Sequence, residues 1–255
     1  MRIQHNIMAL NAHRNSGVNQ TAVSKNMEKL SSGYRINRAG DDAAGLSISE
    51  KMRGQIRGLT QASRNAQDGI SFIQTAEGAL NEVSSMLTRL KELAVQKASG
   101  TYSADDITNL ELEMTQLGEA ADKIITDTKF NNIAVFDGEI DVVISDDDTD
   151  TFAVGYDLDA LGITSSSSSE DIEDAITSIN EARATLGSQQ NRLEHTINNL
   201  GTTTENLVAA ESRIRDVDMA SEMMEMTKNN ILSQAAQAMI AQANQQPQNV
   251  LQLLR

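Results

Sequence analysis

The sequence lacks cysteine and tryptophan, contains a single proline, and has only seven aromatic residues. Without cysteine the chain can form neither a disulfide nor a thiolate metal site, and it has no cysteine nucleophile. Aromatic side chains supply much of the buried area of ordinary globular cores, so their scarcity argues against a thick core. Because proline interrupts helices, its near absence leaves almost the whole chain free to be helical.

Motifs for catalysis and cofactor binding are also missing. The sequence contains no HExxH, GxSxG, GxxxxGK[ST] or GxGxxG. Asp146, Asp148 and Asp150 imitate the first half of a calcium loop. However, Thr151 stands where that loop needs glycine, and Asp157 stands in place of the bidentate glutamate. We therefore predict an acidic turn there, no bound metal or cofactor, and a chain that is not an enzyme.

The net charge of −15 is concentrated in one segment. Residues 130–182 carry 14 acidic residues and no lysine or arginine, which leaves 22 acidic and 21 basic residues elsewhere. This balance argues against nucleic-acid binding, and nearly neutral flanks suit surfaces that approach copies of themselves. No stretch is apolar enough to span a bilayer. The first residues contain no apolar run of signal-peptide length, so we expect any export to occur without an ordinary cleaved signal.

Two long heptad repeats occupy the middle of the chain. A seven-residue apolar repeat sustained over this length predicts helices packed along their lengths. The second repeat alone would extend roughly 65 Å at about 1.5 Å per residue. The two sets are Met52, Leu59, Ala66, Ile73, Leu80, Leu87 and Ala94, and Ile172, Ile179, Leu186, Leu193, Leu200, Leu207 and Ile214.

Capping residues and a β-prone segment complete this picture. We predict that Ser103 caps a further helix, that Ser168 with Asp171 caps the second repeat, and that Ser47 with Glu50 caps the first. Alternating apolar residues on either side of an acidic turn predict a hairpin at about 130–168. The predicted fold class is therefore mainly α: an elongated antiparallel helical bundle or coiled coil with one small β-hairpin.

The sequence predicts a helix at each end of the chain, with apolar residues that have little intramolecular core to pack against. Residues 1–34 read as an amphipathic helix, and residues 229–254 carry no charge, with Gln or Asn at 11 of 26 positions. An uncharged helix with little intramolecular core nearby suggests burial against another copy of the chain. The predicted assembly interface is Ile3, Ile7, Leu10, Val23, Met27, Leu30, Leu232, Met239, Ile240, Val250, Leu251 and Leu254.

Both ends closely resemble bacterial flagellin, most of all the flagellins of Bacillus-like bacteria. The resemblance rests on long ordered stretches, including KNMEKLSSGYRINRAGDDAAGLSISEKMRGQIRGL (25–59), ENLVAAESRIRDVDMA (205–220) and NNILSQAAQAMIAQANQQPQNVLQLLR (229–255). It implies a minimal flagellin without outer domains. It also implies a terminal inner-core domain of residues 1–41 with 215–255, and an elongated helical domain of residues 42–214.

The resemblance also implies a function and a set of partners. The chain would be a structural subunit of the flagellar filament that self-assembles through its terminal helices into a hollow helical tube for motility. Its partners would be copies of itself, the flagellar export apparatus with an export chaperone, the filament cap, and the hook–filament junction proteins. It would be secreted into an extracellular filament. The alternative is a hook–filament junction adaptor, a relative with similar ends that is present in few copies.

A host Toll-like receptor is a further partner that the resemblance implies. The corresponding contact residues are Arg89, Leu93 and Glu113. The sequence departs from the strongly recognised pattern at Leu117, where an arginine is usual. For Leu93 and Leu117, packing between helices is the competing interpretation.

Overall fold

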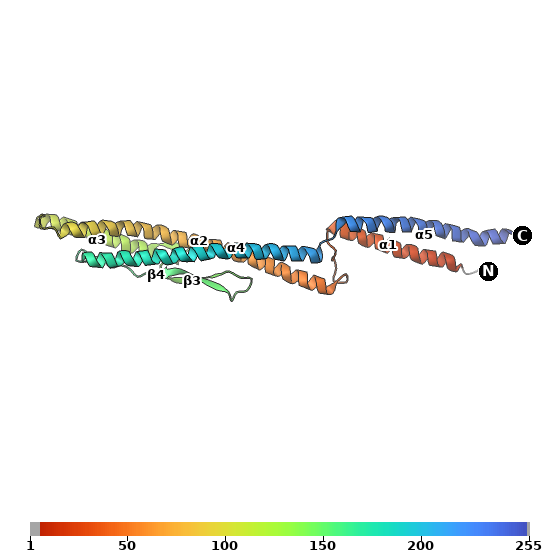
Figure 1. Cartoon of the computed structure of the whole chain (residues 1–255), viewed down its shortest axis with the longest axis horizontal. Coiled ribbons are helices and arrows are strands. Elements are labelled where there is room, and N and C mark those ends of the chain that lie inside the picture. Colours follow the sequence, from red (N-terminus) through yellow and green to blue (C-terminus); the bar gives the residue numbers. More distant parts are fainter. Residues whose placement is uncertain (1–5, 254–255) are drawn as a thin grey trace. The chain divides into compact units, whose positions relative to one another are not determined.

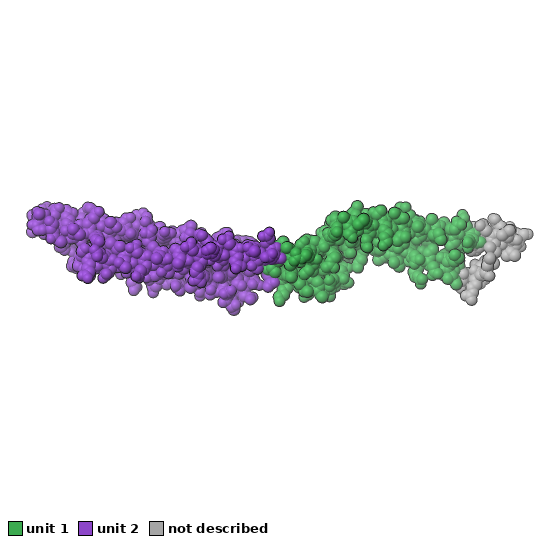
Figure 2. All heavy atoms as spheres, viewed as in Figure 1, with its two compact units in different colours: residues 1–53, 207–255 green, residues 54–206 purple. Residues whose placement is uncertain are grey.

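In the computed structural model, residues 6–253 are described, with side chains described up to residue 246. The chain divides into two compact units (Figure 2): unit 1 comprises residues 1–53 and 207–255, and unit 2 comprises residues 54–206. The domain boundaries expected from the sequence remain a prediction. The elements are α1 (Ile7–Ser32), α2 (Ala43–Lys97), α3 (Ala104–Asp127), β1 (Lys129–Phe130), β2 (Ile133–Ala134), β3 (Asp137–Val143), β4 (Thr151–Asp157), α4 (Ser169–Arg215) and α5 (Met219–Leu253).

The mainly α fold with a small β-hairpin is confirmed. In unit 2, α3 and α4 each run antiparallel to α2 (Figure 1). Ion pairs connect the helices in this arrangement, from Lys91 to Glu173 at 2.8 Å and from Lys97 to Glu111 at 2.8 Å. One hydrophobic core receives side chains from all three helices and from the hairpin. Its fully buried members include the heptad residues Ile73, Leu80, Leu87, Ile172, Ile179, Leu186 and Leu193.

Helix starts agree with the predicted caps in two of three cases. The Ser103 hydroxyl accepts from Asp106 N at 3.3 Å, and Asp106 in turn accepts from Ser103 N. The hydrogen bond from the Ser103 side chain is the main reason that the pKa of Asp106 is lowered. The Ser168 cap is also present. The Ser47 prediction was wrong, because α2 begins at Ala43 and Asp42 Oδ1 already accepts from Gly45 N at 2.9 Å.

Two hairpins follow α3. The predicted hairpin is β3 paired antiparallel with β4, with Val142 opposite Phe152 and Ile140 opposite Val154. A shorter hairpin, β1 with β2, was not predicted from the sequence. Its turn consists of two asparagines in sequence, Asn131 and Asn132, with φ of 49° and 67°. Asparagine tolerates this left-handed conformation and is favoured in two-residue hairpin turns, so the Asn-Asn pair was an available signal.

The segment between β4 and α4 is held against α3. Asp122 Oδ1 accepts from Leu161 N at 2.8 Å and from Gly162 N at 3.3 Å. The carbonyl oxygen of Ile163 lies so close to Gly118 that a Cβ at that position would be 2.2 Å from it. Gly118 therefore allows this segment to approach α3 more closely than a residue with a side chain would.

Unit 1 is built on a pair of antiparallel helices, α1 and α5, which lie side by side (Figure 1). Gly33 caps the C-terminus of α1, with a φ of 75° and a hydrogen bond from its backbone N–H to Lys29 O. The two connectors beyond the pair run antiparallel to each other. Arg35 N donates to Arg215 O at 2.7 Å, and Val217 N donates to Gly33 O at 3.0 Å. These bonds fix where α5 begins relative to the end of α1.

Candidate assembly interface

The contact between α1 and α5 is narrow and largely polar. Among the described side chains of these two helices, Val23 is the only apolar one that is buried, whereas Asn26, Glu222 and Ser233 are buried polar residues. Lys29 Nζ lies 3.4 Å from Glu222 Oε1. With its carboxamide nitrogen toward Glu222, Asn26 bridges Glu222 Oε1 at 3.1 Å and Met226 N at 3.2 Å. A buried polar group of this kind fixes the register of two helices but contributes little hydrophobic stability.

Large apolar side chains instead lie on the outer surface of the pair. Eleven of them are exposed on α1 and α5, and Leu10 is 66% exposed. Exposed large apolar side chains in this number on one helix pair make the pair a candidate interaction site. The eleven are Ile7, Met8, Leu10, Val18, Met27, Met219, Met223, Met224, Ile231, Leu232 and Met239.

The predicted interface residues divide between three environments. Ile7, Leu10, Met27, Leu232 and Met239 are exposed. By contrast, Val23 is buried within unit 1, and Leu30 and Ile240 are half-buried. Ile3 and Leu254 lie outside the described residues, as do the side chains of Val250 and Leu251.

Sequence reasoning missed several exposed apolar residues on the same two helices. Met219, Met223 and Met224 belong to one short stretch, MASEMMEMT, at the start of α5. Their clustering in the sequence was an available signal. They lie before the charge-free segment that begins at residue 229, on which the predicted interface of the C-terminal end rests.

Arg215 forms the centre of the connector region in unit 1. Its Nη1 donates to Glu50 Oε1 at 2.7 Å, and its guanidinium carbon lies 4.9 Å from the ring centroid of Tyr34. The hydrogen bond from Arg215 is the largest cause of the lowered pKa of Glu50. Because Glu50 and Arg215 are distant in sequence, no local pattern signalled this contact.

The residues that the resemblance assigns to receptor contact lie in unit 2. Arg89 Nη2 is 3.0 Å from Glu113 Oε1, and both side chains are about half exposed. Leu93, in contrast, is fully buried in the core of unit 2. Its side chain therefore serves helix packing in the described structure.

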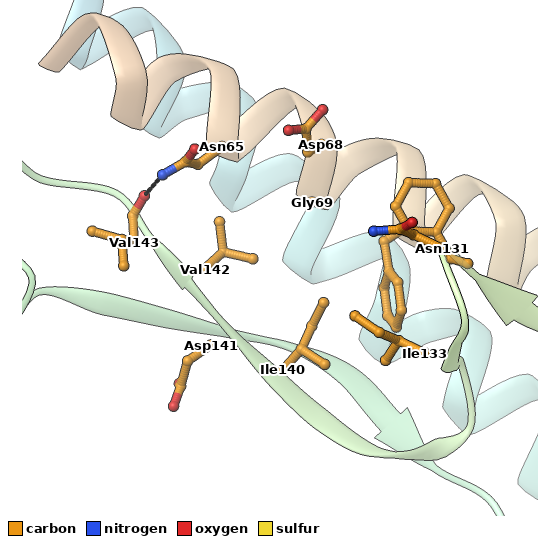
Figure 3. Close-up of a pocket in the computed structure, with 11 residues that line it drawn as sticks. Asn65, Asp68, Gly69, Asn131, Ile133, Ile140, Asp141, Val142 and Val143 are labelled. Carbon is orange, nitrogen blue, oxygen red and sulfur yellow. Dashed lines mark hydrogen bonds between the residues drawn. The ribbon is translucent and has the colours of Figure 1, made fainter. Parts of the chain in front are cut away.

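A groove in unit 2 offers no chemistry of its own. It has a volume of about 270 Å³ and lies between α2 and strand β3 (Figure 3). Most of its lining is apolar, Asn65 Nδ2 donates to Val143 O at 3.2 Å, and Asp141 points away from the groove. The groove lacks a base paired with a nucleophile. We interpret it as the packing contact between the β3–β4 hairpin and α2.

The described residues form neither a metal-binding cluster nor a membrane-spanning helix. No group of three or more His, Cys, Asp or Glu residues within residues 6–253 is arranged to hold a metal ion. In the same part of the chain, no helix combines the length and apolarity needed to cross a bilayer. The acidic side chains of the β3–β4 turn, Asp146, Asp147, Asp148 and Asp150, are all exposed.

Comparison with known proteins accounts for both ends of the chain. Residues 3–141 match the bacterial flagellin N-terminal helical region, and residues 170–254 match the bacterial flagellin C-terminal helical region. A flagellin of Halalkalibacterium halodurans is 56% identical over 272 residues, and one of Bacillus subtilis is 50% identical over 304 residues. The flagellar filament 33 kDa core protein of Treponema phagedenis is 46% identical over 286 residues. Each alignment covers 100% of both chains.

Proposed function

The chain belongs to the bacterial flagellin family and is a structural subunit of the flagellar filament, and we propose that it polymerises through the exposed apolar surface of α1 and α5. One observation supports this proposal: eleven large apolar side chains lie exposed on a helix pair that buries only Val23 among its described apolar residues. This surface comprises those eleven side chains and is called the assembly surface below. Of the predicted interface, Ile7, Leu10, Met27, Leu232 and Met239 belong to it.

The energetics favour contact with further copies. Fully burying a side chain of this size stabilises by about 1.5–3 kcal/mol, so covering the exposed half of each contributes roughly 1 kcal/mol. Eleven such residues together contribute on the order of 10 kcal/mol, which is comparable with the entropic cost of association. Assembly is therefore expected to depend steeply on this surface, and removing a few residues from it should abolish growth.

The charge distribution is consistent with the same arrangement. From residue 229 onward, α5 carries no lysine, arginine, aspartate or glutamate. Copies of the chain can therefore approach this part of α5 without like-charge repulsion. The acidic segment, residues 130–182, lies outside α1 and α5. We assign it to the solvent-facing part of the filament.

The remaining partners follow from the family and form part of the proposal. Subunits that build an extracellular filament must leave the cell, and we assign this step to the flagellar export apparatus with an export chaperone. The filament cap and the hook–filament junction would contact the subunit at the filament ends. Toll-like receptor contact is proposed for Arg89 and Glu113, whose side chains are accessible, and not for Leu93. No enzymatic activity is proposed.

The junction-adaptor alternative receives less support. The three relatives described above are flagellins or a filament core protein, and each matches this chain over its whole length. A junction adaptor would terminate seeds, whereas a filament subunit would lengthen them. The same experiment therefore tests both hypotheses.

Seeded assembly is the decisive experiment. Purified subunit is added to short sheared filaments, sedimented, and imaged by electron microscopy. Leu10→Gln should raise the critical concentration about tenfold, because it removes roughly 1–2 kcal/mol of apolar burial per subunit. Leucine and glutamine have similar helix propensities, so α1 itself should persist.

Leu112→Gln supplies the matched control. Leu112 is 61% exposed, compared with 66% for Leu10, but it lies on α3 in unit 2. We expect a much smaller change in critical concentration for this variant. Normal growth of Leu10→Gln, or equal defects in both variants, would contradict the assignment of polymerisation to the assembly surface. A parent chain that only caps the seeds would favour the adaptor.

A further inference from the structure

Methionine is distributed very unevenly between the two units. Nine of the eleven methionines lie in unit 1, and unit 2 contains only Met86 and Met114. Met114 is fully buried and Met86 is half-buried. Six methionines of unit 1 are instead exposed, which is uncommon for a large apolar side chain. The six are Met8, Met27, Met219, Met223, Met224 and Met239.

Four of these exposed residues lie at one level of the helix pair. Asn26 of α1 contacts Glu222 and Met226 of α5, so the adjacent Met27 lies beside the α5 stretch that carries Met219, Met223 and Met224. These four residues, Met27, Met219, Met223 and Met224, form what we call the methionine cluster. Met224 is 68% exposed, and the other three are 48–56% exposed.

Thioether sulfur gives this cluster a chemistry that leucine or isoleucine would lack. A peroxide transfers one oxygen atom to the methionine sulfur, the O–O bond breaks, and hydrogen peroxide leaves as water. The sulfur is oxidised to a sulfoxide while the peroxide is reduced, and the flexible apolar side chain becomes polar. Exposed methionines react readily, whereas a buried residue such as Met114 is shielded.

We propose that the methionine cluster is a reversible oxidation site that prevents the free subunit from polymerising while it is oxidised. The inference rests on the proposed assembly surface, because all four residues belong to it. Burying a sulfoxide oxygen without a hydrogen-bond partner is unfavourable, so oxidised subunits assemble poorly. Methionine sulfoxide reductases, which take electrons from a thiol reductant, restore the thioether and with it assembly. Once the surface is covered in the polymer, the same sulfurs are protected.

The test compares oxidised and untreated subunits in the seeded assembly described above. Full-length subunit is treated with hydrogen peroxide, excess oxidant is removed, and the modified methionines are mapped by peptide mass spectrometry. We expect oxidation of the cluster in preference to Met114, and an increase of about tenfold or more in critical concentration. Treatment with both sulfoxide reductases and dithiothreitol should restore growth. Helix content, followed by circular dichroism, should change little.

Two variants locate the effect. Met8 and Met239 are exposed on the same surface, so both chains compared carry Met8→Leu and Met239→Leu. In this background, the four-leucine variant adds Met27→Leu, Met219→Leu, Met223→Leu and Met224→Leu, and it should assemble and resist peroxide. Adding Met86→Leu instead should leave the background as sensitive to peroxide as before. Oxidised parent that assembles normally would overturn the proposal. So would a four-leucine variant that loses assembly on oxidation as the parent does, because the sensitive sulfurs would then lie elsewhere.

A separate measurement keeps the two proposals distinguishable. Untreated parent that fails to extend seeds would count against the assembly surface itself, independently of any oxidation. The four-leucine variant could fail to assemble even without peroxide. In that case the proposal is tested by comparing peroxide oxidation of the four methionines in the parent subunit and in the parent filament. Strong protection of the four sulfurs in the filament supports the proposal, and equal oxidation in both forms refutes it.

Discussion

Replacing Gly118 with alanine should destabilise unit 2, although the same change stabilises most exposed helix positions. A Cβ at Gly118 would lie 2.2 Å from Ile163 O and 3.2 Å from Ile163 C. Restoring van der Waals contact requires a displacement of about 1 Å in the Ile163 backbone. That backbone cannot move freely, because Ile163 is buried and Asp122 holds the two preceding residues.

The magnitude follows from two opposing effects. Alanine in place of glycine inside a helix contributes about 1 kcal/mol. Overpacking against a fixed backbone costs about 1–3 kcal/mol or more. We therefore expect Gly118→Ala to lower the free energy of unfolding by up to about 2 kcal/mol. Gly187 in α4 is exposed and has no atom within 4 Å of an added Cβ, so Gly187→Ala should raise it by about 0.5–1 kcal/mol.

Urea unfolding of the full-length subunit, followed by circular dichroism, measures both changes. The slope of unfolding free energy against urea should match between variants, so that midpoints compare directly. Gly78→Ala provides a second open position, on α2. If Gly118→Ala unfolds at a higher urea concentration than the parent, as Gly187→Ala is expected to do, then the close approach to Ile163 does not constrain the protein.

Three further predictions concern contacts that connect distant parts of the sequence. Gln189→Leu should lower the free energy of unfolding by about 2–4 kcal/mol, because Gln189 hydrogen-bonds both the N–H and the carbonyl of buried Gly155. The control Gln190→Leu, at a more exposed position, should change the free energy of unfolding little in the same urea assay. Arg215→Lys should lower the melting temperature of the full chain, since lysine cannot reproduce both the Glu50 hydrogen bond and stacking on Tyr34, and an equal effect of Arg213→Lys would contradict this. The hydrogen bond from Lys25 holds the pKa of Asp41 at about 2, below its ordinary 3.8. The ionised Asp41 carboxyl therefore contributes its full stabilisation of the folded chain above pH 3.8, and this contribution is lost as the pH falls toward about 2. Asp41→Asn should flatten this part of the acid unfolding curve, and carbon NMR of the Asp41 carboxyl in the parent chain should show a midpoint near 2.

Local sequence determined the helices and one repeating row of buried positions along each of α2 and α4. Heptad spacing identified Ile73, Leu80, Ile179 and Leu186 as core residues because an α-helix returns to the same face every three to four residues. Caps at Ser103 and Ser168 were equally readable, since the capping hydrogen bonds join residues three apart. The resemblance at both ends supplied the family, and the comparisons confirmed it.

Only the tertiary structure decided which apolar residues are covered. Val23 and Met27 are four residues apart and both belong to the predicted assembly interface, yet Val23 is buried and Met27 is 56% exposed. Their four-residue spacing places both on one face of α1, but it does not determine how much of that face α5 covers. The contacts of Gln189 with Gly155 and of Arg215 with Glu50 were invisible for the same reason. Periodicity reports the geometry of one helix, whereas burial and hydrogen-bond pairing depend on segments that meet only after the chain has folded.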